Sequence, residues 1–115
     1  MHKKTRKLLG DIQDAICFIL EAVRDLPLSS YQSDRMRRQA IERNFEIIGE
    51  AVNRIVKVDK AIIERISHYS QIIAFRNVLS HGYDLIDDEQ VWHVIQESLP
   101  SLLQQIEAIL KEAEE

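Results

Sequence analysis

Residues 76–83 gather the side chains of this sequence that are best suited to chemistry: Arg76-Asn77-Val78-Leu79-Ser80-His81-Gly82-Tyr83. An arginine fork can hold a phosphate group, and a histidine can take up or release a proton near neutral pH. We therefore interpret Arg76 and His81 as candidate catalytic residues, with Asn77 and Ser80 in support. This combination suggests the cleavage of a phosphodiester bond.

The spacing of Arg76 and His81 indicates that the two side chains do not lie on the same face of one helix. Five residues correspond to about 140° around an ideal helix axis. Asn77 and His81 are four residues apart and share one face, while Arg76 and Ser80 share another. Either the helix unwinds near Gly82, or a second copy of the chain completes the site across a two-fold axis. We favour the second alternative, which predicts a homodimer.

With RNA as the substrate no metal is required, because the 2′-hydroxyl of RNA supplies the nucleophile. One histidine can remove the 2′ proton or protonate the leaving 5′ oxygen, and two copies of His81 can do both. Arg76 can stabilise charge on the phosphate oxygens, and Asn77 can orient the imidazole or hold the phosphate. The competing structural interpretation makes Arg76 an ion-pair partner and His81 a favourable charge at a helix end.

The composition is that of a single globular domain over residues 1–115, with 45% apolar and 30% charged residues. No apolar run approaches the roughly 20 residues of a membrane span, so we expect no membrane association. The single cysteine, Cys17, fits a reducing cytoplasm. The net charge of -4 argues against broad electrostatic binding to nucleic acid but permits a small basic pocket for an RNA end or loop.

Regular apolar periodicity and few turn residues predict an all-α, up-and-down bundle of four to five helices. Only 3 Gly and 2 Pro are available to break the chain. We expect helices at about residues 4–25, 32–56 and 69–81, and a nearly continuous pair that begins at Asp87 and divides near 98–101. A short helical turn is expected over 59–66, and residues 111–115 are expected to fray.

Particular residues refine this prediction. Gly49 lies inside the second helix, where glycine costs about 1 kcal/mol relative to alanine, so close contact with another helix is the expected compensation. Gly82 is expected to end the 69–81 helix in the left-handed conformation. Met36 and Cys17 are assigned to buried helix faces.

The wider sequence is similar to the HepT-like proteins of the HEPN superfamily. Residues 76–83 resemble that family's Arg-x4-His-x-Tyr signature, and residues 43–51, RNFEIIGEA, resemble its second-helix block. Residues 72–75 lead into the motif as in the family, and residues 87–100 resemble its closing segment. These matches cover nearly the whole chain in the family's order. Gly82 is a departure, because many relatives carry a larger residue there.

The resemblance implies an HEPN-like bundle that dimerises and acts as a metal-independent endoribonuclease, the toxin of a type VII-like toxin–antitoxin system, without a cofactor. It also implies a partner, a minimal nucleotidyltransferase antitoxin that attaches AMP to the tyrosine of the motif, here Tyr83. Added phosphate and adenine beside Arg76 and His81 would occupy the phosphate site and repel RNA. The competing hypothesis is a non-catalytic helical partner subunit of such a nucleotidyltransferase.

Overall fold

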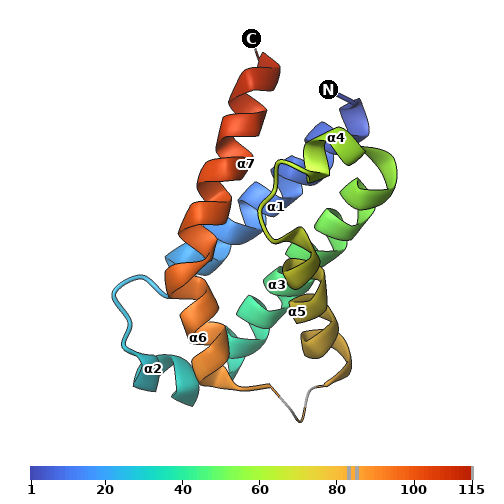
Figure 1. Cartoon of the computed structure of the whole chain (residues 1–115). Coiled ribbons are helices and arrows are strands. Elements are labelled where there is room, and N and C mark those ends of the chain that lie inside the picture. The colour runs from blue at the N-terminus through green and yellow to red at the C-terminus, as the bar shows by residue number, and fades with distance from the viewer. Residues whose placement is uncertain (83, 85, 115) are drawn as a thin grey trace.

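The computed structural model describes residues 1–82, 84 and 86–114, and these form helices and no strand. The helices are α1 (Lys3–Ala22), α2 (Leu28–Ser33), α3 (Arg35–Val58), α4 (Lys60–Ile63), α5 (Tyr69–His81), α6 (Asp88–Glu97) and α7 (Leu99–Glu114). Figure 1 shows α1, α3, α5 and α7 running in alternating directions, with both chain ends at the same end of the bundle. The predicted all-α, up-and-down fold is confirmed. Of the two short helices, α4 lies in the helical turn expected over 59–66, whereas α2 was not predicted.

Helix α3 lies at the centre of the fold. It packs against α1 on one side and α5 on the other, while α7 packs on α1 and α6 contacts both α2 and α7. The core is largely aliphatic, because apolar side chains recur at helical spacing on the facing sides of α1 and α3. Its fully buried members include Leu9, Ile12, Ile16, Ile19, Ile41, Ile48 and Ile55. In the helix predicted over residues 4–25, an apolar stripe from Leu8 to Leu26 recurs at helical spacing. The members of this stripe from Leu8 to Val23 are buried, whereas Leu26, beyond the end of α1, is only half-buried.

The helix predicted over residues 32–56 is in fact two helices, because Asp34 begins α3. The backbone of Asp34 is extended, and its side chain accepts a hydrogen bond from the backbone N–H of Arg37 at 3.1 Å. This is the usual way in which an aspartate satisfies a free N–H at a helix start. The first helix also ends earlier than predicted, at Ala22, and Asp25 adopts a left-handed φ of 60° in the turn that follows.

Several local predictions are confirmed. The short turn expected over 59–66 contains α4, and Asp87 caps α6 by accepting from the N–H of Glu89 at 2.9 Å. Helix α7 begins at Leu99, with Pro100 in its first turn. Proline is tolerated there because the first N–H groups of a helix have no intrahelical partner.

Four other predictions are wrong. Gly82 follows the last residue of α5 but has a φ of -118°, so it is not left-handed. Cys17 is exposed, because it lies about 100° around the helix from the buried Ile16. Met36 is 84% exposed, since it precedes the buried stripe of α3, which begins at Ile41.

The fourth correction concerns the chain end, which is helical through Glu114. Arg65 pairs with Glu112 at 2.7 Å, and the Arg6 side chain donates to the carbonyl of Ala113 at 2.9 Å. These contacts hold the last turn of α7 against neighbouring parts of the chain. Among the described residues, no helix has both the length and the apolar character that crossing a membrane requires.

A half-buried polar cluster joins α3 to α6. Arg38 of α3 and Asp88 of α6 form an ion pair at 3.9 Å. Burial raises the pKa of Glu42, the charge of Asp88 raises it further, and Arg38 partly opposes this. The ring of Tyr31 is fully buried beside Trp92, with centroids 5.5 Å apart. Glu42 therefore carries its charge in an unfavourable position.

We expect Glu42→Gln to stabilise the protein at neutral pH by up to about 1 kcal/mol. When folding raises the pKa of a carboxyl, the group's contribution to the stability of the protein is complete at pH values below its ordinary pKa of about 4.3. This contribution is lost as the pH rises through the pKa in the folded protein. The gain from Glu42→Gln should therefore be largest at pH 7 and vanish near pH 4. Urea unfolding at both pH values measures it, with the exposed Glu64→Gln as control. An equal gain at both pH values would contradict the assignment.

Candidate functional site

The motif occupies the second half of α5, which remains a regular helix through His81. The N–H of Gly82 still bonds to the carbonyl of Val78 at 2.8 Å, four residues back. The helix therefore does not unwind between Arg76 and His81, and these residues lie about 140° apart around its axis. A single α5 cannot present both side chains in the same direction from their Cα atoms.

The two faces of α5 differ in exposure. Asn77 and His81 are exposed, whereas Arg76 and Ser80 are half-buried on the side toward α3. Val78 is 45% exposed beside Asn77. The structure thus brings Asn77 and His81 to one open face, as their spacing predicts, and places Arg76 at its border.

Asn77 brings the end of the Arg76 side chain toward the open face. Nη1 of Arg76 donates to Oδ1 of Asn77 at 3.0 Å. Because this contact occupies the Asn77 oxygen, the amide N–H₂ group of Asn77 remains available to donate to a ligand oxygen. The arginine fork and the amide donor together are suited to holding a phosphate.

The charge of Arg76 is not balanced by a carboxylate within the described part of the chain. Arg43 and Arg54 of α3 pair with Glu46 and Glu50 at 3.5 and 2.9 Å, but Arg76 forms no ion pair there. Its Nε is buried and has no hydrogen-bond partner among the described residues. An uncompensated, half-buried guanidinium favours an anion.

The stem of Arg76 lies directly on α3 at Gly49. An added Cβ at position 49 would overlap Cβ of Arg76 and lie 2.6 Å from its Cγ. The close helix contact that Gly49 predicted is therefore confirmed. The sequence did not reveal its partner, although a glycine inside a helix was a usable signal.

Aromatic and aliphatic packing fixes the rest of α5 against α3. The rings of Phe45 and Phe75 meet edge to face, with centroids 5.1 Å apart, and Leu79 is buried. Leu79 is the only buried residue of α5, although Ile72, Ile73 and Phe75 contact the core in part.

A groove of about 540 Å³ lies along α5, between it and the α6–α7 segment. It was not predicted from the sequence. Its floor is apolar, and its edges carry serine and glutamine side chains together with His68 and Glu97. The residues that line it include Phe45, Ile48, Ile72, Phe75, Val78, Val94, Leu99, Leu102, Ser101 and Gln105. Val78, inside the motif, forms part of this groove.

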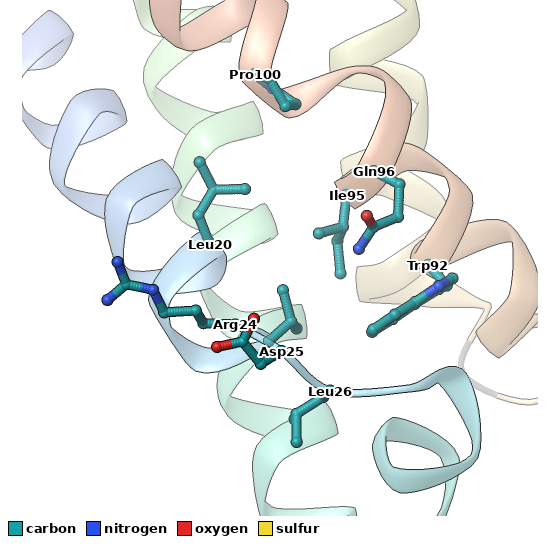
Figure 2. Close-up of a pocket in the computed structure, with 9 residues that line it drawn as sticks. Leu20, Arg24, Asp25, Leu26, Trp92, Ile95, Gln96 and Pro100 are labelled. Atoms are coloured by element: carbon teal, nitrogen blue, oxygen red, sulfur yellow. The ribbon is translucent and has the colours of Figure 1, made fainter.

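A second hollow of about 400 Å³ lies where α1 ends and α6 meets α7. Figure 2 shows Leu20, Arg24 and Asp25 on one side of it and Trp92, Ile95 and Gln96 of α6 on the other. None of its lining residues belongs to the motif, so this hollow is separate from the candidate site. Tyr83, the remaining predicted site residue, lies outside the described residues. Within residues 1–82, 84 and 86–114, no three metal-ligating side chains cluster.

Comparison with known proteins matches nearly the whole chain. A family model described as Ribonuclease HepT-like matches residues 12–109. The probable ribonuclease HepT of Thermococcus cleftensis is 30% identical over 111 residues, which cover 96% of this chain and 100% of the relative. A protein of Methanocaldococcus jannaschii named as a candidate RNase is 27% identical over 117 residues, 97% of this chain and 92% of the relative. No solved structure matches.

Proposed function

The chain belongs to the HepT-like ribonuclease family, and we propose that it is a metal-independent endoribonuclease that acts through Arg76 and His81. The proposal rests on the surroundings of the Arg76 side chain. Its guanidinium is half-buried, lacks a carboxylate partner among the described residues, and is held by Asn77 at the border of the face that carries His81. A phosphodiester supplies the anion that this arrangement lacks.

The proposed reaction uses the 2′-hydroxyl of RNA as nucleophile. One His81 removes the 2′ proton as the 2′ oxygen bonds to phosphorus, and a second His81 gives a proton to the 5′ oxygen as the P–O5′ bond breaks. The products are a 2′,3′-cyclic phosphate and a 5′-hydroxyl. Arg76 stabilises the charge on the non-bridging oxygens, and the Asn77 amide adds a donor. Ser80, half-buried on the Arg76 side of α5, supports that side.

We also propose a homodimer in which two α5 helices face each other. Two His81 side chains in one cleft require two copies of the chain, because one regular helix carries only one. The open face of α5 carries Ala74 and Val78, and the adjoining groove has an apolar floor. A second copy would cover this surface, whose exposure in one chain is otherwise unfavourable.

The resemblance to the HepT-like family also suggests a partner for the enzyme and a means of controlling it. We propose that the protein is a toxin and that a minimal nucleotidyltransferase antitoxin transfers AMP from ATP to the hydroxyl of Tyr83, with pyrophosphate leaving. Two residues of chain span at most about 7 Å, so a nucleotide attached to residue 83 is within reach of His81. Its phosphate would compete for Arg76 and repel RNA.

The proposal is tested with purified protein and RNA in the presence of EDTA. We expect cleavage, and light scattering should give twice the 13.4 kDa mass of one chain. A protein that leaves RNA intact and is harmless when expressed alone would instead support the non-catalytic partner subunit. A monomer that cleaves RNA would contradict the shared site but not the activity.

A further inference from the structure

We infer that Gly49 is a positioning residue for Arg76, and that α3 thereby sets where the guanidinium lies. The effect of Gly49 on cleavage rests on the proposed function, but whether Gly49 places Arg76 can be tested separately. Gly49 is buried in the middle of α3, two turns from any helix end. Glycine in a helix interior lowers stability by about 1 kcal/mol relative to alanine, so we expect a specific contact to offset this cost.

The contact that Gly49 permits is with Arg76 itself. A methyl group at position 49 would overlap Cβ of Arg76 and lie 2.6 Å from Cγ, and it would also lie 3.5 Å from the carbonyl oxygen of Ile72. The Cβ of Arg76 is fixed by the backbone of α5, so a rotamer change cannot relieve the overlap. Either α5 moves away from α3, or Arg76 is displaced with the turn that carries it.

The path of the Arg76 side chain makes this placement specific. Its stem crosses α3 at Gly49, its Nε is buried without a partner in the described residues, and its Nη1 reaches Oδ1 of Asn77 at 3.0 Å. The Arg76 side chain is thus fixed at its base, where Cβ and Cγ lie on Gly49, and at its tip, where Nη1 donates to Asn77. Displacement of the stem would move the guanidinium away from the face that carries His81.

Gly10 supplies a matched control. It also lies inside a long helix, α1, but a Cβ added there meets nothing within 4 Å. We expect Gly10→Ala to raise the melting temperature and leave cleavage unchanged, because alanine favours helix without a clash. Gly49→Ala should lower the melting temperature and, assayed well below it, reduce the rate of RNA cleavage by about 10²-fold.

The readout specific to Arg76 is its Nε–H resonance in a ¹⁵N-labelled sample, assigned by its loss in Arg76→Lys. Because Nε is buried, this signal should exchange with water more slowly than those of exposed arginines. In Gly49→Ala it should shift and exchange faster, whereas Gly10→Ala should leave it unchanged. A wild-type Nε–H signal in folded Gly49→Ala would overturn the inference. A shifted signal with unchanged cleavage would overturn the positioning role.

If Gly49→Ala does not fold, a double variant decides the question. In an Arg76→Gly background the overlapping atoms are gone, so adding Gly49→Ala should not lower the melting temperature further. An equal loss of stability in both backgrounds would overturn the inference. If wild-type protein cleaves no RNA, the proposed function fails, while the resonance and the double variant still decide whether Gly49 places Arg76.

Discussion

His81→Ala is expected to reduce RNA cleavage in EDTA by about 10²–10⁴-fold, the range that one general acid–base group contributes. His81 is the exposed last residue of α5, and its side chain makes no hydrogen bond to the rest of the described chain. Its removal should therefore leave the fold and the melting temperature unchanged. In the proposed dimer the substitution removes both copies at once, so the loss should lie at the upper end of the range.

The matched control for His81 is His93, an exposed histidine on α6 that lies outside the motif. Cleavage rates of wild type, His81→Ala and His93→Ala on one RNA, each with its circular dichroism spectrum, make the comparison. His93→Ala should behave as wild type. Robust cleavage by folded His81→Ala would remove His81 from the mechanism.

Arg76→Lys is expected to lower cleavage by about 10²–10³-fold, as the loss of one well-placed donor to a developing oxyanion does. Lysine keeps the positive charge and the Cβ and Cγ atoms that pack on Gly49, so the contact between α3 and α5 should persist. It loses the planar fork and the Nη1 donor to Asn77. The defect should therefore reflect geometry rather than charge or stability.

Arg65 offers the control for this substitution, since it is an arginine paired with Glu112 at 2.7 Å, away from the motif. Arg65→Lys should retain wild-type kcat, whereas Arg76→Lys should lose kcat more than it raises KM. If Arg76→Lys cleaves RNA at the wild-type rate, the fork is not needed, and Arg76 has at most a structural role.

The helices were predictable where apolar residues recur at helical spacing or where a capping residue marks a helix start. The spacing from Leu8 to Val23 indicated both the first helix and its buried face, and Asp87 marked the start of α6. The break at Asp34 was missed because the residues on either side of it fit one continuous helix, although aspartate itself is a preferred residue at a helix start. A single extended residue interrupts such a pattern without changing its composition.

The site was predictable only in part, because its decisive contacts do not follow helical periodicity. Residues adjacent in sequence do not face each other on a helix, so the hydrogen bond between Arg76 and Asn77 depends on the length of the arginine side chain. The contact with Gly49 depends on the register between α3 and α5, which no local pattern specifies. The sequence could single out Gly49 and Arg76 separately, but only the structure pairs them.

The chemical ends of the RNA fragments test the central claim most directly, because they report which oxygen attacked the phosphorus. Wild-type protein in EDTA should leave a 2′,3′-cyclic phosphate on one fragment and a 5′-hydroxyl on the other, detected by mass spectrometry. RNA with a single 2′-deoxy substitution at the cleaved position should resist the enzyme. Fragments that end in a 3′-hydroxyl and a 5′-phosphate, or cleavage of the 2′-deoxy RNA, would contradict the proposed chemistry of Arg76 and His81.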